Sequence, residues 1–259
     1  MNLPKEMGAR GPDMIDLHCH LLPGLDDGAA SLETSCAMAR QAVASGVRRV
    51  ICTPHCMTGD RHAARRLERI ALAAETLRAA LDRHKIPLAL STGMELLCHT
   101  ALPETLARGE VLTLAGSRYL LMEFPFQMTL SRIEWAVETV RQSGYRPVLA
   151  HPERYAAVCR APDCLAAWFR AGYVLQLDKD SILGRFGSGC ARAADWALHH
   201  GVAHVVASDA HGVHSRTADL AEVQRVLRRR YPPGYAELLL VRNPKRIVED
   251  RELVTPEEF

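Results

Sequence analysis

The stretch MIDLHCHLLPGLDDGA, residues 14–29, places two histidines and three aspartates around one apolar run. Its first part, Met14–His20, has the length and apolar content of a buried strand. Side chains two residues apart on a strand point to the same side, so Asp16, His18 and His20 share one face. Cys19 then points to the opposite face. The segment therefore predicts a strand that ends in a pair of imidazoles facing the same way.

A glycine-containing loop follows this strand and carries two further carboxylates, Asp26 and Asp27. Gly24 and Gly28 permit the backbone to make a tight approach back over the end of the strand. Either aspartate can then reach the imidazoles. Spacing alone does not decide between them.

Short β-rich runs alternate with longer helical runs from about residue 14 to residue 230, as in repeated strand-helix units around a parallel sheet. A chain of 259 residues is an ordinary length for one α/β barrel. The expected strands are Met14–His20, Val47–His55, Pro87–Leu96, Tyr119–Phe124, Pro147–Pro152, Tyr173–Asp178 and His204–His211. The expected helices are Leu32–Ser45, Arg61–His84, Leu130–Gln142, Asp163–Arg170, Ala191–His200 and Asp219–Arg230. One or two closing helices are expected in Pro232–Phe259, the second starting at Asn243-Pro244.

Bulk composition excludes several classes of protein. Lysine plus arginine (32) nearly balance aspartate plus glutamate (30), so there is no electrostatic footprint for nucleic acid or a membrane surface. No apolar run is long enough to span a bilayer, and the N-terminus lacks the apolar region of a signal peptide. We therefore expect a cytoplasmic protein whose eight cysteines stay reduced. No Cys-x-x-Cys pair suggests a structural zinc site.

Titratable residues gather at one place in each unit, the C-terminal end of the predicted strand. In a parallel barrel those ends meet on one face, where active sites lie. A single residue of this kind is more often hydrogen-bonded within the protein, or caps a helix, than it binds a metal. Together they would be costly to bury unpaired, and cations are the natural compensation. The set is His18, His20, His55, Glu95, Glu123, His151, Asp209 and His211.

A mixed set of imidazoles and carboxylates without thiolate suits manganese, iron or zinc. Eight or nine donors exceed what one ion needs, so two or three ions with bridging carboxylates are implied. Arg154 and Arg216 occur in loops after ligand-bearing strands, where a guanidinium can grip a phosphate or carboxylate by a bidentate fork. A multinuclear metal centre with arginines beside it indicates phosphate-ester hydrolysis.

These motifs resemble those of the PHP (polymerase and histidinol phosphatase) superfamily. Within it the sequence is most similar to the CpsB type, the manganese-dependent protein-tyrosine phosphatases of capsule and exopolysaccharide operons. The resemblance runs from about Met14 to Asp250. It is carried by MIDLHCHLLPGLDDGA, ICTPH, STGMEL, LLMEFP, LAHPERY, SILGRFG, and SDAH followed by Arg216.

The resemblance implies a distorted seven-stranded (β/α) barrel, the TIM-like PHP fold, holding three divalent metal ions, with manganese as the family metal and iron or zinc as alternatives. Its ligands would be His18, His20, Glu95 and Asp209 for the first ion, Glu95, Glu123 and His151 for the second, and Asp27, His55 and His211 for the third. Arg154 and Arg216 match the arginines that bind the phosphoryl group. The motif match favours Asp27 over Asp26.

The leading functional hypothesis is a tyrosine phosphatase acting on the Tyr-rich tail of a bacterial tyrosine autokinase that controls exopolysaccharide or capsule synthesis. One rival is a PHP phosphoesterase for a small substrate such as histidinol phosphate, and another is an inactive scaffold that binds metal or phosphoprotein. We expect residues 14–259 to form one domain after an N-terminal extension, residues 1–13.

The sequence departs from the family pattern at a few positions. Cys19 and Cys56 stand near predicted ligands where the family carries other residues, and we expect them to pack rather than to react. Asp178–Asp180 is expected to change the rim of the substrate site, and the role of His214 stays open.

Overall fold

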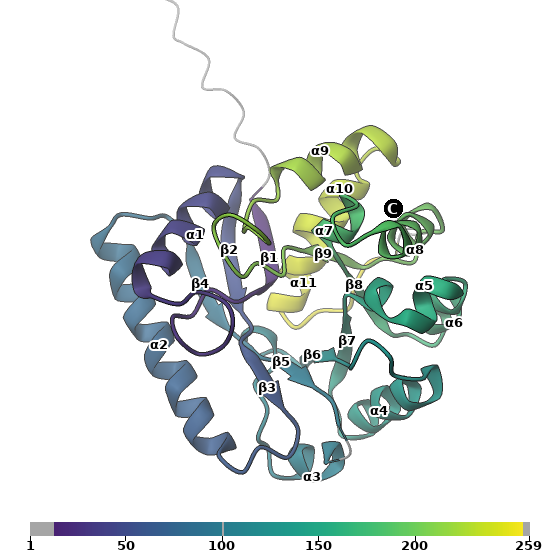
Figure 1. Ribbon diagram of the computed structural model, residues 1–259, viewed down its shortest axis with the longest axis horizontal. Helices are drawn as coiled ribbons and strands as arrows, with labels where there is room; N and C mark the ends of the chain where they lie inside the picture. The colour runs from purple at the N-terminus through teal and green to yellow at the C-terminus, as the bar shows by residue number, and fades with distance from the viewer. Residues whose placement is uncertain (1–12, 100, 256–259) are drawn as a thin grey trace, which may run out of the picture.

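The computed structural model describes residues 13–99 and 101–255, so nearly all of the predicted N-terminal extension lies outside the described residues. Parallel strands alternate with helices that surround them (Figure 1). The strands are β1 (Met14–Cys19), β2 (Val47–Cys52), β3 (His55–Met57), β4 (Ala89–Thr92), β5 (Glu95–Leu97), β6 (Tyr119–Glu123), β7 (Arg146–Ala150), β8 (Val174–Asp178) and β9 (Val205–Ala207).

The six helices predicted before the closing segment are all present, within a few residues of the expected bounds. They are α1 (Leu32–Ala44), α2 (Ala63–Arg83), α4 (Leu130–Gln142), α6 (Cys164–Arg170), α8 (Ser188–His199) and α9 (Ala221–Arg230). The short helices α3 (Leu102–Ala107), α5 (Ala156–Arg160) and α7 (Lys179–Ile182), and the single turns η1 (Leu114–Gly116) and η2 (Pro152–Arg154), were not predicted. The closing segment forms α10 (Tyr235–Glu237), a π-helical turn η3 (Leu238–Arg242) and α11 (Asn243–Val248), which begins at the predicted Asn243.

Two predicted strands are each divided into two shorter ones. Val47–His55 becomes β2 and β3, and Pro87–Leu96 becomes β4 and β5. Pro54 separates β2 from β3 because proline has no N–H to donate to a strand ladder. The pieces keep the same neighbours, since the Gly93 N–H donates to the Cys52 carbonyl (2.9 Å) and the Glu95 N–H to the Pro54 carbonyl (3.2 Å).

All strand pairs are parallel, in the orders β1-β2-β4 and β3-β5-β6-β7-β8-β9. The chain after β9 returns to β1, where the Asp209 N–H donates to the His18 carbonyl and the His20 N–H to the Ala210 carbonyl, both at 2.9 Å. The last strand is thereby joined to the first. The predicted α/β barrel-type fold is confirmed, and its strand ends open at one mouth.

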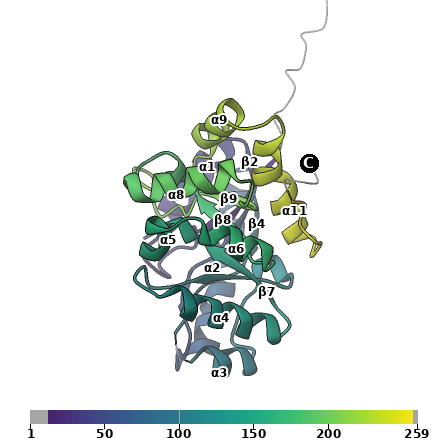
Figure 2. The same ribbon diagram turned by 90° about the vertical axis from the view of Figure 1, so that its right-hand side faces the viewer.

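The core follows the two-residue period of buried parallel strands. On β6, Tyr119 and Leu121 pack with residues of the other strands in one apolar cluster, whereas Leu120 and Met122 pack in the cluster that includes the helices. Tyr119 lies at the start of β6, and its hydroxyl donates to the Arg251 carbonyl (2.7 Å). The segment after α11 therefore covers the end of the strands opposite the ligand-bearing mouth. Figure 2 shows α4, α6 and α8 along one side of the strands.

Within the described residues, no helix combines the length and the apolar content needed to cross a bilayer. The division into one domain, residues 14–259, stays a prediction.

Candidate metal centre

The two imidazoles of the first strand meet two carboxylates from distant parts of the chain. The Nε2 atom of His18 lies 3.2 Å from Glu95 Oε2 and 3.2 Å from Asp209 Oδ1. The Nε2 atom of His20 lies 3.4 Å from each of the same two oxygens. All four side chains are buried. β1, β5 and the loop after β9 thus bring one ligand group together, as the sequence led us to expect.

Hydrogen bonds on the far side of each ring fix which nitrogen faces this group. Nδ1–H of His18 donates to Gln176 Oε1 (2.9 Å), and Nδ1–H of His20 donates to Asp26 Oδ2 (2.7 Å). We assign the protons to Nδ1 because a carboxylate and an amide oxygen can only accept. Both Nε2 lone pairs then point at the carboxylates, which is the arrangement of metal-binding histidines. Sequence spacing gave no signal for Gln176, and it left the role of Asp26 open.

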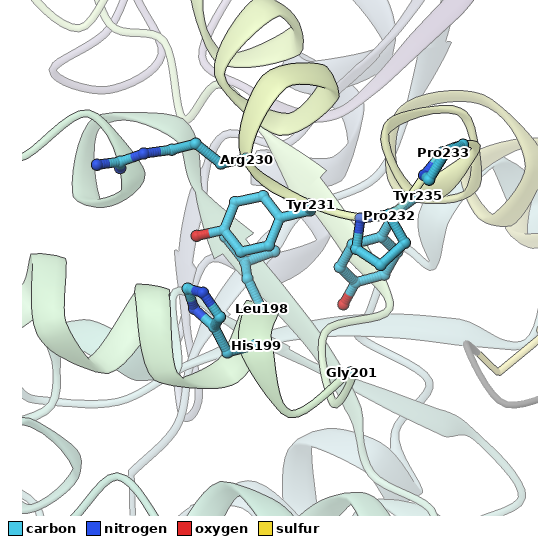
Figure 3. Close-up of a pocket in the computed structure, with 8 residues that line it drawn as sticks. All are labelled: Leu198, His199, Gly201, Arg230, Tyr231, Pro232, Pro233 and Tyr235. Atoms are coloured by element: carbon cyan, nitrogen blue, oxygen red, sulfur yellow. The ribbon is translucent and has the colours of Figure 1, made fainter.

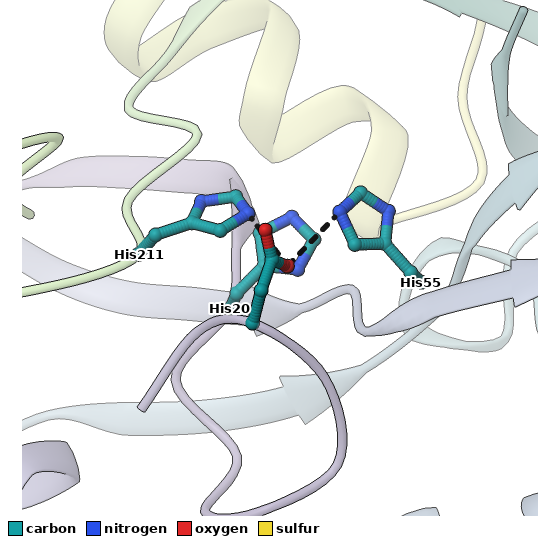
Figure 4. A group of neighbouring side chains, drawn as sticks. His20, His55 and His211 are labelled. Carbon is teal, nitrogen blue, oxygen red and sulfur yellow. Dashed lines mark ion pairs between the residues drawn. The ribbon is translucent and has the colours of Figure 1, made fainter. Parts of the chain in front are cut away.

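A second group lies nearer the surface, around Asp27. Its Oδ1 atom is 3.4 Å from His55 Nε2 and 3.3 Å from His211 Nε2. The rings of His20, His55 and His211 converge there (Figure 4), with ring centroids 4.4 Å apart for His20 and His55 and 3.9 Å for His20 and His211. Nδ1–H of His211 donates to the Asp209 carbonyl (2.9 Å), which leaves Nε2 facing Asp27.

Glu95 stands between these groups and a third one. Its Oε1 atom lies 3.0 Å from His151 Nε2, while Oε2 lies 2.9 Å from His55 Nδ1. Glu123 approaches both rings, at 3.7 Å from His151 Nε2 and 3.7 Å from His55 Nδ1. Glu95 therefore directs one oxygen to each side, as a bridging carboxylate would. His55 contributes to two groups, one through each ring nitrogen.

Three residues of the site have left-handed backbone conformations, which residues other than glycine rarely adopt. The φ angles are +34° for His151, +47° for Asp209 and +45° for Arg216. Such conformations cost free energy and persist where surrounding contacts enforce them, most often at functional sites. They turn the chain sharply at the ends of β7 and β9, so that the side chains face the mouth.

The charges in the cluster depend on one another. Burial alone would raise the pKa of Glu95 and of Asp209, but the neighbouring His18 and further imidazoles hold both pKa values well below the usual range. Burial alone would lower the pKa of His18, yet Glu95 and Asp209 raise it to about 9. Burial and the charge of Glu95 raise the pKa of Glu123. The carboxylates thus require positive charge beside them, from protons on the imidazoles or from a cation in their place.

The donor set fits a divalent cation. In the part of the chain that the structure describes, three buried ligand atoms have no hydrogen-bond partner: Glu95 Oε2, Asp209 Oδ1 and His211 Nε2. Burying such atoms without a partner costs free energy, and coordination to a metal would remove that cost. Three groups have ligand atoms within 4.8 Å of one another: His18, His20, Glu95 and Asp209; His20, Asp27, His55 and His211; and His55, Glu95 and Glu123. All nine predicted ligands lie in this region, His151 through its contact with Glu95.

The two cysteines near the site have protonated thiols. Burial raises the pKa of Cys19 well above its usual value and that of Cys56 to about 12. The Cys19 thiol faces the Ala210 carbonyl rather than the imidazoles. His214 is exposed on the loop after β9.

Both predicted arginines reach the outer oxygen of a ligand carboxylate. Arg154 and Arg216 donate to Asp209 Oδ2, at 3.0 Å and 2.5 Å, while Oδ1 of the same carboxylate faces the imidazoles. The guanidinium of Arg154 also lies between two aromatic rings, 4.7 Å from the centroid of Phe126 and 4.4 Å from that of Phe186. The sequence reasoning assigned no role to either ring, because the pairing depends on two loops that are distant in sequence.

The effect of Asp178–Asp180 on the rim of the substrate site stays a prediction. All three side chains are buried, and Lys179 Nζ donates to Asp180 Oδ1 (2.9 Å). Asp178 lies beneath the site, with Oδ2 at 3.7 Å from Arg154 Nη1. The charges of this segment are thus neutralised within the protein.

A hollow of about 450 Å³ opens beside the ligands and is lined by Leu25, Asp26, His55, Cys56, Met57, Arg66, Leu97 and Glu123. A separate hollow of about 350 Å³ lies between the end of α8 and the segment after α9 (Figure 3), lined by Leu198, His199, Gly201, Arg230, Tyr231, Pro232, Pro233 and Tyr235. The described residues that line this second hollow include none of the predicted ligands. The hollow beside the predicted ligands is therefore the candidate substrate site.

The family model for capsular polysaccharide synthesis proteins, CpsB/CapC, matches residues 14–249. The chain belongs to this family. The resemblance drawn from the sequence motifs is thus confirmed. A curated member, the tyrosine-protein phosphatase YwqE of Bacillus subtilis (strain 168), is 34% identical over 255 residues, which cover 93% of this chain and 98% of YwqE.

Solved structures agree with this family assignment. A chain from the crystal structures of YwqE from Bacillus subtilis and CpsB from Streptococcus pneumoniae, described as unique metal-dependent tyrosine phosphatases, matches with a TM-score of 0.85 at 32% identity. The match covers 93% of this chain and 97% of that chain. The lactonase Lmo2620 of Listeria monocytogenes matches with a TM-score of 0.60 at 10% identity, over 94% of this chain and 96% of its own. At that identity the lactonase shares the fold alone.

Proposed function

We propose that this CpsB/CapC family chain is a metal-dependent protein-tyrosine phosphatase. The hollow at the mouth carries the proposal, because it combines two kinds of lining. His55 and Glu123 of the metal centre line it together with the apolar side chains of Leu25, Met57 and Leu97. Met57 is 53% exposed and so offers apolar surface for a substrate to cover. In a phenyl phosphate, the phosphoryl group can lie at the metal centre while the ring packs on the apolar side chains. An alkyl phosphate has no ring to fill that apolar surface.

The resident cofactor in this proposal is a set of three divalent cations, with manganese as the metal. The ligands are His18, His20, Glu95 and Asp209 for the first, Glu95, Glu123 and His151 for the second, and Asp27, His55 and His211 for the third. When bound, the cations supply positive charge that lowers the pKa of water and offsets the negative charge of the phosphoryl group. The proximity of the donor atoms supports the first and third sets. The distances from His151 Nε2 to Glu95 (3.0 Å) and to Glu123 (3.7 Å) support the second.

The two arginines bind the phosphoryl oxygens. Each guanidinium has N–H groups beyond the one that it donates to Asp209, and these can form charge-assisted hydrogen bonds with the equatorial oxygens of the substrate. The rings of Phe126 and Phe186 cover the faces of Arg154 and keep its fork oriented. A tyrosyl leaving group, with a phenol pKa of about 10, departs with little help from a general acid.

The partner in this proposal is the phosphorylated, Tyr-rich tail of a bacterial tyrosine autokinase in a capsule or exopolysaccharide pathway. The family description, capsular polysaccharide synthesis, supports this context. A cytoplasmic location stays part of the proposal. All eight cysteines are free thiols, and a reducing compartment keeps thiols in that state.

The test compares hydrolysis of a phosphotyrosine peptide with that of histidinol phosphate by chelator-stripped protein reloaded with manganese. We expect manganese-dependent turnover that favours the peptide. Arg154→Ala should lower kcat/KM by roughly 10²- to 10³-fold, the usual loss of a group that stabilises transition-state charge. Arg160→Ala is the matched control, because this arginine is exposed on the neighbouring α5.

A preference for histidinol phosphate would contradict the tyrosine-phosphatase proposal and favour a small-molecule phosphoesterase. If the protein binds manganese and the phosphopeptide but does not hydrolyse it, the alternative of an inactive scaffold that binds metal or phosphoprotein would be favoured.

A further inference from the structure

A third hollow adjoins the mouth, at the start of α2. It has a volume of about 300 Å³ and is lined by Asp60, His62, Arg65, Arg66 and Arg69. We call it the arginine hollow. Its three arginines outnumber its single aspartate, so its lining carries an excess of positive charge.

The arginine hollow is next to the hollow at the mouth, and the two share the lining residue Arg66. Arg66 lines both this hollow and the one that contains His55 and Glu123. Arg69 Nη2 donates to the Gly24 carbonyl (3.2 Å), in the loop that also carries Asp27. A chain leaving the metal centre across Arg66 therefore passes directly over the arginine hollow.

Among the residues that the structure describes, one of the three arginines forms an ion pair. Arg66 Nε donates to Asp60 Oδ2 at 2.7 Å, and both side chains are partly buried. Arg69 contacts a neutral carbonyl and is exposed. Arg65 is exposed and, in the described part of the chain, has no carboxylate within ion-pair distance. Two positive charges thus stay available to a ligand, beside a site that we propose to bind a phosphopeptide.

We infer that the arginine hollow binds an anionic group located next to the phosphotyrosine in the same substrate peptide; this rests on the proposed function. The group is an acidic side chain or a second phosphotyrosine, since both present oxygens that guanidinium groups accept well. The substrate class is therefore a phosphotyrosine peptide with anionic flanking residues. The interaction lies at the surface, so it raises the specificity for such peptides and weakens with salt.

The experiment measures kcat/KM of the manganese-loaded enzyme for three peptides that share one phosphotyrosine. Their flanks are neutral, glutamate-rich, or carry a second phosphotyrosine. We expect both anionic peptides to exceed the neutral one, by roughly five-fold, in line with one or two exposed ion pairs. The ratio should approach one as ionic strength rises from about 0.05 M to about 0.5 M. The relative rank of the two anionic peptides distinguishes a carboxylate from a phosphate as the preferred group.

The variants Arg65→Ser and Arg65→Glu change the charge of the hollow at a residue that forms no ion pair. The ratio of anionic to neutral kcat/KM should fall in the first variant and drop below one in the second. Arg228→Glu on α9 makes the same charge change on an exposed helix elsewhere and should leave the ratio as in wild type. A wild-type ratio of one at low salt, or a ratio that Arg65→Glu does not change, overturns the inference while hydrolysis of the neutral peptide still supports the proposed function. Failure to hydrolyse any of the peptides overturns both.

Discussion

At the scale of single residues, Asp26 and Asp27 are neighbours with different tasks. Asp27 is 67% exposed in its side chain and faces His55 and His211. Asp26 is nearly buried and accepts hydrogen bonds from His20 Nδ1 and from the His55 N–H (3.0 Å). Asp26 therefore orients the predicted ligands His20 and His55, whereas Asp27 itself faces two imidazoles.

Replacing Asp26 with asparagine keeps the size of the side chain and removes its charge. The asparagine holds His20 less firmly and makes its ring less basic. We expect the affinity for manganese to fall by roughly 10- to 100-fold, the usual effect of losing such a partner. Calorimetric titration of stripped protein measures this, with the exposed Asp82→Asn as control. Unchanged affinity would mean that the ring contacts around His20 suffice to orient it.

The aromatic rings around Arg154 suggest a second change, Phe186→Leu. The leucine keeps apolar volume but loses the ring face 4.4 Å from the guanidinium. A cation–π contact of about 0.5–1 kcal/mol corresponds to a two- to five-fold loss in affinity. The KM for p-nitrophenyl phosphate should rise by that factor with kcat nearly unchanged, while Phe186→Tyr should match wild type. An equal rise in KM for the tyrosine variant would assign the effect to packing instead.

At the scale of elements, the loop between β1 and α1 depends on one glycine. A Cβ atom at Gly28 would overlap the carbonyl oxygen and Cβ of His20. The loop approaches this closely because the Ala29 N–H donates to the same His20 carbonyl (3.0 Å). The close approach expected from the sequence is thus present, and it places Asp26 and Asp27 over the end of β1.

Gly28→Ala should force the loop away from β1. We expect the free energy of unfolding to fall by about 1–3 kcal/mol, as for other overpacked sites, and manganese binding to weaken because Asp26 and Asp27 move. Chemical denaturation and metal titration measure the two effects. Gly189→Ala is the control, since a Cβ there meets only Cys159 at an ordinary 3.6 Å. A stable Gly28 variant with normal metal affinity would show that the loop can move without cost.

The sequence predicted elements well where a single strand or helix carried its own signal. The positions of the strands along the chain, the long helices and the convergence of the ligands all follow from periodicity and the rule for parallel strands. The break at Pro54 could have been foreseen from its missing N–H. By contrast, Gln176 behind His18 and Phe186 beside Arg154 depend on how β8 and the following loop pack, which no local pattern encodes.

At the scale of the whole molecule, a histidine far from the mouth couples folding to pH. His204 is buried, its Nδ1 accepts the Leu175 N–H (3.1 Å), and burial followed by the charge of Arg146 lowers its pKa to about 4. In the unfolded chain its pKa is about 6.5. Between these values the unfolded state binds more protons, so stability falls as pH drops below about 6.5.

Between pH 7 and pH 5, protonation of His204 in the unfolded chain should lower the free energy of unfolding by about 2 kcal/mol. His204→Gln removes the titration, so its loss of stability over that interval should be smaller than that of wild type by this amount. Urea denaturation of metal-free protein at both pH values measures the difference, with the exposed His84→Gln as control. Parallel pH profiles for wild type and His204→Gln would rule out the coupling.

The junction between β1 and β9 has a consequence for how the protein matures during synthesis. His18 and His20 are translated long before Asp209 and His211, and hydrogen bonds between the two segments hold them side by side. Until then β1 has an open edge, and the first predicted ligand group lacks the carboxylate of Asp209. Completion of the predicted metal centre therefore requires a chain that has been translated past β9 and closed upon itself.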